Sequence, residues 1–345
     1  MSGSHRRFSR ASSFVIAGWV IVFFARALAA QTPSPALVVL EKRDRALVIV
    51  DPATLKIAGR VPAGPDPHEV ECSPDGRRAY ISNYGGDGSL HTISVVDLDA
   101  QKALPAIDLG ALRSPHGLAF VGGKLYFTVE SNKVVGRVDP ATQAVDWLMG
   151  TGQDGTHMVV VSPALDRVFT SNVSSGTISI FEQVERTARN FGTTWRLTNV
   201  AAGRGAEGFD LAPDGKTIWT ANAQDGTVTV IDVAAKKATE TFAIPVRGNR
   251  LKFTRDGGRV LVSGSPSGST RANLVILDVA SHQVVKSFDF GGASAGILVL
   301  PDGSRAFIAV SEGDKVVGVD LQKLQIVGEI ATGHEPDGLA WAQRK

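Results

Sequence analysis

A phrase of four residues returns seven times along the chain, and it constrains the fold more than any other feature of the sequence. In chain order the copies are Pro67-His68-Glu69-Val70, Pro115-His116-Gly117-Leu118, Thr156-His157-Met158-Val159, Ala206-Glu207-Gly208-Phe209, Gly248-Asn249-Arg250-Leu251, Ser294-Ala295-Gly296-Ile297 and Pro336-Asp337-Gly338-Leu339. The second residue of the phrase recurs at spacings of 48, 41, 50, 42, 46 and 42 residues. This period is typical of the four-stranded blade of a β-propeller. We therefore predict an all-β, seven-bladed β-propeller of four-stranded antiparallel blades.

Each repeat has the same internal order of strands and turns, which is clearest in the fourth repeat. Apolar and polar residues alternate with a period of two in four segments, which predicts strands at Gly208–Ala212, Thr217–Asn222, Thr227–Asp232 and Thr239–Ile244. Pro213-Asp214-Gly215 separates the first two strands and favours a tight turn, because proline presets φ and glycine accepts a positive φ. An acidic residue closes the third strand of every repeat, at Asp51, Asp97, Asp139, Glu182, Asp232, Asp278 and Asp320.

The two ends of the chain hold different parts of one repeat. The C-terminal segment Pro336–Trp341 has the pattern of a first strand alone. The other three strands of that repeat are predicted near the start of the chain, at Leu37–Glu41, Ala46–Asp51 and Ile57–Pro62. We predict that the seventh blade is shared between the two ends, because this arrangement pairs both of them and leaves no long open sheet edge.

Three segments of the repeats carry a resemblance to a known family. They are Tyr80-Ile81-Ser82-Asn83, Phe169-Thr170-Ser171-Asn172 and Trp219-Thr220-Ala221-Asn222. Together with the third strands of Val-Ile-Asp type, they resemble the YVTN-type repeat (YncE-like) seven-bladed β-propeller family over residues 36–342. The repeats at Leu261-Val262-Ser263-Gly264 and Phe307-Ile308-Ala309-Val310 lack the asparagine. The resemblance implies an exported propeller but no single chemistry, because the fold hosts binding proteins, scaffolds and enzymes.

Residues 1–30 have the pattern of a secretory signal. Basic residues are followed by the nearly apolar run Phe14–Ala25 and by the small residues of Ala27-Leu28-Ala29, as in a cleavable signal peptide. The run is shorter than the roughly 20 apolar residues of a membrane span. We expect cleavage near Ala30 and a periplasmic, secreted or cell-surface location. Residues 31–345 would form a single domain without a transmembrane span, which we expect to be a monomer.

Charge limits the partners that the chain is expected to bind, and cysteine content limits its disulfides. Residues 1–30 hold four of the 36 basic residues and none of the 34 acidic ones, so the remainder has 32 basic residues and a net charge of −2. A nearly neutral surface gives no electrostatic footprint for nucleic acid, which is therefore not an expected partner. Cys72 is the only cysteine, so no disulfide within the chain can form.

The second residue of the phrase points to a candidate site. The first strand of each propeller blade lines the central channel, so these seven residues should form a ring at one rim. We predict a ligand-binding site there, made by His68, His116, His157, Glu207, Asn249 and Asp337. The three histidines lie on consecutive blades, and imidazole nitrogens suit a divalent metal or a general base. The alternative is that the Pro-His-Gly step serves only the turn into the inner strand.

Three repeats are longer than the others. Two of them are lengthened between the second and third strands, at Tyr84–His91 and Ser265–Asn273. In propeller topology these connections emerge on the face that carries the ring of second residues, where loops on a rigid scaffold build binding sites. The third is lengthened at Gln183–Thr194, between its third and fourth strands, and would project from the opposite face or the outer edge. Neutral variation of surface loops is the alternative explanation.

Three functions remain open from the sequence. The leading hypothesis is a non-catalytic binding or scaffold protein whose partner, a protein, a glycan or a small molecule, binds the histidine face. The alternative is a metal-assisted hydrolase, lyase or lactonase in which the histidines hold an ion and Glu207 or Asp337 moves a proton. DNA binding is a weaker third hypothesis, because the nearly neutral charge does not support it. No complete set of catalytic residues can be identified.

Overall fold

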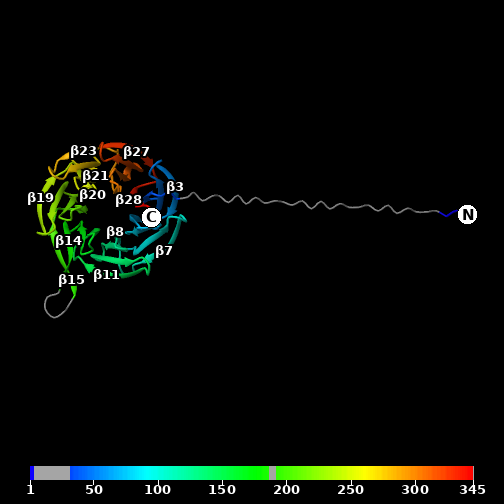
Figure 1. The fold of residues 1–345 in the computed structure, drawn as a ribbon, viewed down its shortest axis with the longest axis horizontal. Coiled ribbons are helices and arrows are strands. Elements are labelled where there is room, and N and C mark those ends of the chain that lie inside the picture. The colour runs from blue at the N-terminus through cyan, green and yellow to red at the C-terminus, as the bar shows by residue number, and fades with distance from the viewer. Residues whose placement is uncertain (4–31, 186–191, 345) are drawn as a thin grey trace. The chain divides into compact units, whose positions relative to one another are not determined.

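The computed structural model describes residues 1–3, 32–185 and 192–344. The predicted signal segment, apart from its first three residues, lies outside this part. Within the unit that spans Gln31–Lys345, seven four-stranded antiparallel sheets surround a central axis (Figure 1). The prediction of an all-β, seven-bladed propeller is therefore confirmed. Among the described residues, none of the helices is both long and apolar enough to span a membrane.

Blades 1 to 6 each contain four consecutive strands, with the innermost strand first. In blades 1 to 3 the strands are β4 (Pro67–Cys72), β5 (Arg78–Asn83), β6 (Thr92–Asp97), β7 (Lys102–Asp108), β8 (Pro115–Val121), β9 (Lys124–Val129), β10 (Val134–Asp139), β11 (Ala144–Gly150), β12 (Thr156–Val161), β13 (Arg167–Asn172), β14 (Thr177–Glu185) and β15 (Thr193–Ala201). In blades 4 to 6 they are β16 (Ala206–Leu211), β17 (Thr217–Asn222), β18 (Thr227–Asp232), β19 (Lys237–Ala243), β20 (Val246–Phe253), β21 (Arg259–Pro266), β22 (Leu274–Asp278), β23 (Val284–Phe288), β24 (Ile297–Val299), β25 (Arg305–Val310), β26 (Lys315–Asp320) and β27 (Gln325–Ala331). A short 3-10 turn, η1 (Ser311–Gly313), follows β25.

Blade 7 closes the ring with strands from both ends of the chain. Its strand order is β28-β1-β2-β3, where β28 (Pro336–Ala342) is the inner strand and β1 (Ala36–Glu41), β2 (Ala46–Asp51) and β3 (Lys56–Pro62) follow it outward. Leu37 of β1 lies opposite Trp341 of β28 in the antiparallel ladder. The predicted closure is thus present, and β1 is buried along its whole length.

The Ser-Asn pair that ends β5 explains the recurring motif in physical terms. Ser82 Oγ accepts a hydrogen bond of 3.1 Å from the backbone amide of Glu69 on the inner strand. Asn83 donates to the hydroxyls of Thr92 and Ser94 on the third strand, at 2.8 and 2.9 Å. Asn172 and Asn222 make the corresponding bonds in blades 3 and 4. These buried asparagines therefore tie the second strand of a blade to its third.

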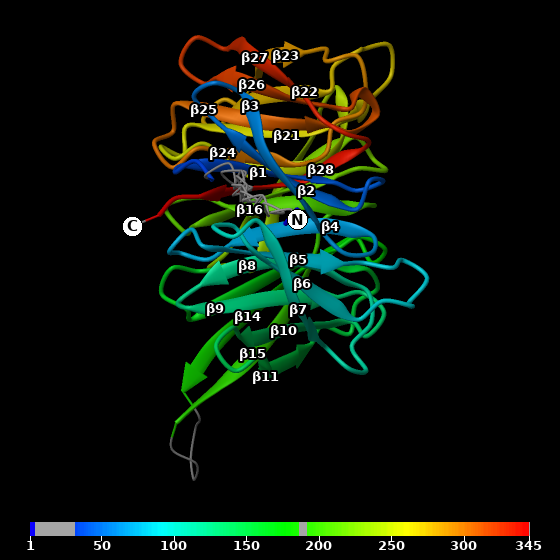
Figure 2. The same ribbon diagram turned by 90° about the vertical axis from the view of Figure 1, so that its right-hand side faces the viewer.

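The acid at the end of the third strand caps the turn to the fourth strand. Asp51, for example, accepts a hydrogen bond of 2.9 Å from the amide of Ala53, the local bond that favours aspartate in turns. Blade 3 has Glu182 at this position, which pairs instead with Lys236. The prediction of a loop over residues 183–194 is wrong in part, because β14 continues to Glu185, which lies opposite Thr193 of β15. Figure 2 shows this longer hairpin extending past the other outer strands.

The inner strands contain a bulge at the repeated phrase. In blade 1 the pairing of β4 with β5 skips from Pro67 to Val70, and such bulges re-aim side chains next to functional sites. The third residue of the phrase is often glycine because the neighbouring inner strand passes close to it. A Cβ atom on Gly338 would lie 2.6 Å from the carbonyl oxygen of His68, and one on Gly208 would lie 2.4 Å from Cα of Arg250. Close packing around the axis thus selects the residue type at this position.

Candidate functional site

All seven second residues of the phrase line one pocket of about 270 Å³ at the mouth of the channel. The structure therefore brings together every residue of the predicted site, namely His68, His116, His157, Glu207, Asn249 and Asp337, with Ala295 as the seventh. That these residues bind a ligand stays a prediction. The remaining lining residues are Lys42, Tyr84, Arg250, Ser265, Ala293, Ser294, Ser311 and Glu335.

A second ring of residues, which the sequence reasoning missed, lies one position beyond the second strand in six blades and at the equivalent position, Ser265 within β21, in blade 5. Its members are Lys42, Tyr84, Glu130, Val173, Ala223, Ser265 and Ser311. In five blades the backbone amide at this position donates, at 2.8 or 3.0 Å, to the carbonyl of the residue that precedes the inner strand: this holds for Lys42, Tyr84, Glu130, Val173 and Ala223. Ser265 lies opposite Arg247 of β20. Strand register would have identified this ring. Tyr84 begins one of the lengthened connections and lines the pocket. The connection predicted at Ser265–Asn273 begins two residues later, because β21 continues to Pro266, and Ser265 lines the pocket from the end of that strand.

His116 and His157 form the core of one wall. Their ring centroids are 3.7 Å apart and the ring planes are tilted by 31°. Nδ1 of His157 contacts Oε1 of Glu130, and its Nε2 lies 3.6 Å from Oε1 of Glu207. The Tyr84 hydroxyl donates a hydrogen bond of 2.6 Å to the other oxygen of Glu130. A continuous polar chain thus runs from Tyr84 through Glu130 to His157.

The two adjacent imidazoles differ in their protonation. Burial alone would lower the pKa of His157, but the carboxylates of Glu130 and Glu207 outweigh it and raise that pKa to about 9. Burial, together with the positive charge of His157 beside it, holds the pKa of His116 well below its usual 6.5. At neutral pH His157 is therefore an imidazolium and His116 is neutral. Nδ1 of His116 and Nε2 of His157 are buried without a hydrogen-bond partner.

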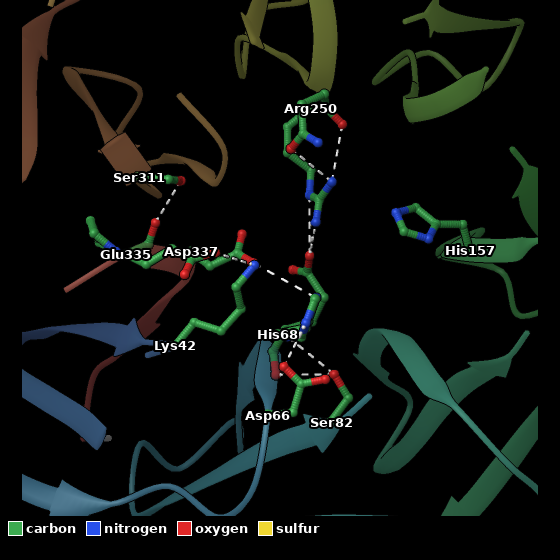
Figure 3. A network of polar contacts seen from close by, with 12 residues as sticks. Lys42, Asp66, His68, Ser82, His157, Arg250, Ser311, Glu335 and Asp337 are labelled. Atoms are coloured by element: carbon green, nitrogen blue, oxygen red, sulfur yellow. Dashed lines mark hydrogen bonds and ion pairs between the residues drawn. The ribbon is translucent and has the colours of Figure 1, made fainter. Parts of the chain in front are cut away.

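Lys42 and Asp337 form the opposite wall, and His68, whose ring lies 5.1 Å from that of His116, joins the two walls. Lys42 Nζ lies 2.8 Å from Glu335 and 3.7 Å from Oδ2 of Asp337. His68 places Nε2 3.1 Å from Asp66 and Nδ1 3.9 Å from Asp337, and burial lowers the pKa of His68. Asp337 Oδ1 has no hydrogen-bond partner. Figure 3 shows Lys42 and Asp337 on one side of the pocket and His157 on the other.

An ion pair crosses the channel one residue further along the inner strands. Glu69 of β4 accepts a hydrogen bond of 3.1 Å from Nε of Arg250 on β20. Arg250 also donates to Oδ1 of Asn249 at 3.0 Å and lies 3.6 Å from Glu207. The side chains of Glu69 and Arg250 are only 14% and 7% exposed. This pair links blade 1 to blade 5.

The group whose ligand atoms lie close enough together to share a metal ion differs from the predicted set of three histidines. It consists of His116, Glu130 and His157, whose ligand atoms lie within 4.8 Å of one another. His68 is not in this group, because its nitrogens face Asp66 and Asp337. Imidazole lone pairs lie in the ring plane, so two stacked rings do not direct them onto one point. Metal binding would require one ring to rotate and His157 to lose a proton.

A larger depression of about 590 Å³ lies away from the channel mouth, between blades 5 and 6. Its two arginines are already engaged: Arg259 donates to the carbonyl of Leu321, and Arg255 lies 3.5 Å from the carbonyls of Val299 and Leu300. None of the unpartnered buried polar atoms found among the described residues lies there. The smaller channel-mouth pocket is therefore the better candidate site.

Comparisons with known proteins agree with this architecture. A family model described as a YNCE-like β-propeller matches residues 121–305. A structure of unknown function from Desulfotomaculum acetoxidans has a TM-score of 0.72 at 13% identity, over 90% of this chain and 100% of that one. The periplasmic gluconolactonase of Pseudomonas aeruginosa has a TM-score of 0.68 at 16% identity, over 91% and 100%. Kuenenia stuttgartiensis hydrazine synthase has a TM-score of 0.66 at 19% identity, over 80% and 89%.

At these identities the solved structures show a shared fold and do not transfer an activity. No curated protein sequence matches the chain significantly. The chain thus shares its fold with propellers that include a lactonase and a protein of unknown function.

Proposed function

The chain belongs to the YNCE-like β-propeller family, and from that premise we propose that it is a non-catalytic binding protein whose channel mouth takes a small polar molecule. One observation carries the proposal. Four buried polar atoms of the same pocket have no hydrogen-bond partner among the described residues: His116 Nδ1, Ser294 Oγ, Asp337 Oδ1 and His157 Nε2, the last of which has only the Glu207 carboxylate at 3.6 Å. Each such atom costs about 1–3 kcal/mol when it stays unpaired. A bound ligand would remove this cost.

The shape of the site supports a small molecule over a protein or a long glycan as the partner. The pocket is concave, about 270 Å³ in volume, and lined by residues from several blades. Small-molecule sites have this form, with a few convergent polar groups that fix the orientation of the ligand. We further propose that the protein acts in the periplasm or at the cell surface, because residues 1–30 have the pattern of a secretory signal.

Isothermal titration calorimetry with the purified protein tests the binding proposal. The panel contains neutral sugars, carboxylic acids, amines and divalent metals. Asp337→Asn and Ser294→Ala should each weaken binding of the best ligand at least tenfold, and His116→Ala combined with His157→Ala should lose little more than the worse single variant. His334→Gln is the matched control, because His334 pairs with Asp44 outside the pocket lining. A panel without any ligand would refute the proposal.

A metal-assisted hydrolase, lyase or lactonase is the second candidate. The His116, Glu130 and His157 group supports it, since these residues supply two nitrogen donors and a carboxylate. A metal held there would polarise a carbonyl or activate water, and Glu207 or Asp337 is available to move a proton. Elemental analysis of the purified protein tests this candidate. Stoichiometric metal that disappears in His116→Ala and persists in His334→Ala would favour it over simple binding.

A further inference from the structure

The charges around the pocket are largely neutralised by one another. Lys42 pairs with Glu335 at 2.8 Å, and Arg250 pairs with Glu69 at 3.1 Å. His157 contacts Glu130. Among the described residues that line the pocket, each cationic side chain therefore already has a carboxylate partner.

Two further carboxylates share these cations. Glu207 lies 3.6 Å from both His157 and Arg250, and Asp337 lies 3.7 Å from Lys42. Acidic groups thus outnumber basic ones at the site. An anionic ligand would meet Glu207 and Asp337 without gaining an unpaired cation, so it would lose its hydration without adequate compensation.

The unpartnered atoms combine donors with acceptors on facing walls. Asp337 Oδ1 can only accept when the carboxylate is ionised, and Ser294 Oγ can donate or accept. Across the pocket, Nε2 of His157 and Nδ1 of His116 are ring nitrogens that can donate or accept, depending on the tautomer. A hydroxyl group donates and accepts at once and so can satisfy either wall. Several hydroxyls on one small framework would match both walls together.

An aromatic surface lies beside these polar atoms. The ring of Tyr84 is 4.7 Å from that of His68 and 4.9 Å from that of His116. Tyr84 is oriented by its hydrogen bond to Glu130, which leaves its ring as an amphipathic wall of the pocket. The C–H face of a saturated ring packs well on such a surface, whereas an extended acid or a bare metal ion gains nothing from it.

We propose that the ligand is a neutral, hydroxyl-rich ring of monosaccharide size, and that the site selects against the corresponding acid and phosphate ester. This inference rests on the proposed binding function and adds the chemical class of the ligand. Asp337 and Ser294 hold hydroxyls on one side, His157 and His116 hold hydroxyl or ring oxygens on the other, and Tyr84 covers one face of the ring.

Matched probes with one carbon skeleton test the selection by charge. Calorimetric titrations compare glucose with gluconate and glucose 6-phosphate, galactose with galactonate, and xylose with xylonate. We expect at least one neutral sugar to bind at least tenfold more tightly than its acid or phosphate. Asp337→Asn should reduce that affinity at least tenfold, and Tyr84→Leu should reduce it while leaving the preference for the neutral form. Asp108→Asn should change nothing, because Asp108 pairs with His91 on the surface.

The possible results of these titrations distinguish an error in the proposed ligand class from an error in the proposed binding function. An acid, phosphate, amine or metal that binds more tightly than the neutral sugars, and loses affinity in His157→Gln or Asp337→Asn, would overturn the ligand class but keep the binding site. Binding of a neutral sugar that is indifferent to both substitutions would overturn the assignment of these residues. The absence of binding by every class of probe would overturn both the ligand class and the binding function.

Discussion

Glu69 accepts a hydrogen bond of 3.1 Å from Nε of Arg250, although 181 positions of the chain separate the two residues. One lies on β4 of blade 1 and the other on β20 of blade 5, so the contact crosses the channel. It occurs at the third position of the repeated phrase, where four of the seven repeats have glycine. Two long side chains thus meet in the space that glycines elsewhere leave to the neighbouring backbone.

We predict that Arg250→Met will destabilise the propeller by about 3–5 kcal/mol, because it leaves Glu69 without its buried cation and Glu207 with His157 alone. Chemical denaturation measures the loss. Adding Glu69→Met should recover part of it, since the double variant no longer buries that unpaired charge. Strictly additive losses would show that the pair is not coupled. Arg204→Met is the control, because the exposed pair of Arg204 with Asp225 contributes about 1 kcal/mol or less.

The fold could be predicted from the sequence because its information is local and repeated. Alternation, Pro-Asp-Gly turns and the acid after each third strand located the blades, and the phase of Pro336–Trp341 located the closure. The failures have local causes. The outer strand predicted at Thr239–Ile244 is found at Lys237–Ala243, because solvent-facing strands have weak apolar patterning. The blade 3 hairpin is longer than expected because Glu182 does not cap a turn as aspartate does.

The candidate site could be predicted only in part. Topology placed the ring that includes His68, His116 and His157 without any knowledge of side-chain contacts. Glu130 and Arg250 were missed, because their importance depends on which side chains face each other across blades. The register of the second strand identifies the position of Glu130, but its contact with His157 depends on side-chain geometry that no sequence pattern encodes.

Thermal stability should be highest near pH 6.5, fall between about pH 6.5 and pH 9 on the alkaline side, and fall again below pH 6.5. The loss of stability at alkaline pH comes from His157. Its side chain faces Glu130, Glu207, Arg250 and His116. Its folded pKa of about 9 exceeds the ordinary value of 6.5, so its stabilising contribution is complete below pH 6.5 and is lost as the pH rises through 9. Melting temperatures measured by circular dichroism should fall less steeply with rising pH in His157→Gln than in the parent protein.

On the acidic side, stability falls as the pH decreases. His116 faces His157, His68, Arg250 and Lys42, and its folded pKa lies well below 6.5. Below pH 6.5 the unfolded chain therefore binds a proton at His116, whereas the folded protein does not. Because protonation favours the unfolded chain, stability falls as the pH drops below 6.5. His116→Gln should reduce the acid slope relative to the parent protein. An unchanged slope in both variants would contradict the assigned charge states.

Gly338→Ala should destabilise the protein by about 1–3 kcal/mol, as overpacking of a close contact does. The added Cβ would lie 2.6 Å from the carbonyl oxygen of His68 and 3.0 Å from Cα of Glu69, and backbone atoms cannot move aside as a side chain can. Gly150→Ala is the matched control, since nothing lies within 4 Å of its Cβ position. Equal midpoints of urea unfolding for the two variants would disprove the close packing of inner strands.

Deletion of residues 336–345 should unfold or aggregate the protein. The deletion removes β28 and exposes the ladder edge of β1, whose apolar side chains are fully buried in the closed ring, and an open apolar edge promotes association. Deletion of 343–345 should cost about 1 kcal/mol or less, because it removes the exposed contacts of Arg344 with Asp99 and Ser34. Size-exclusion chromatography and thermal melts distinguish the two. A longer deletion that melts within a few degrees of the parent would refute closure by β28.

The contact between His116 and His157 makes one spectroscopic prediction that requires no ligand. In an NMR titration of the imidazole resonances, His157 should titrate near pH 9, while His116 stays neutral well below pH 6.5 because of burial and the neighbouring positive charge. His157→Gln removes that charge at a ring distance of 3.7 Å but keeps a buried side chain of similar reach. The pKa of His116 should therefore rise toward its ordinary value without reaching it, because burial still disfavours the imidazolium. His91→Gln should leave the titration of His116 unchanged, since His91 pairs with Asp108 on the surface. If His116 titrates at the same pH with and without His157, the two rings are not electrostatically coupled and the charge assigned to His157 is wrong.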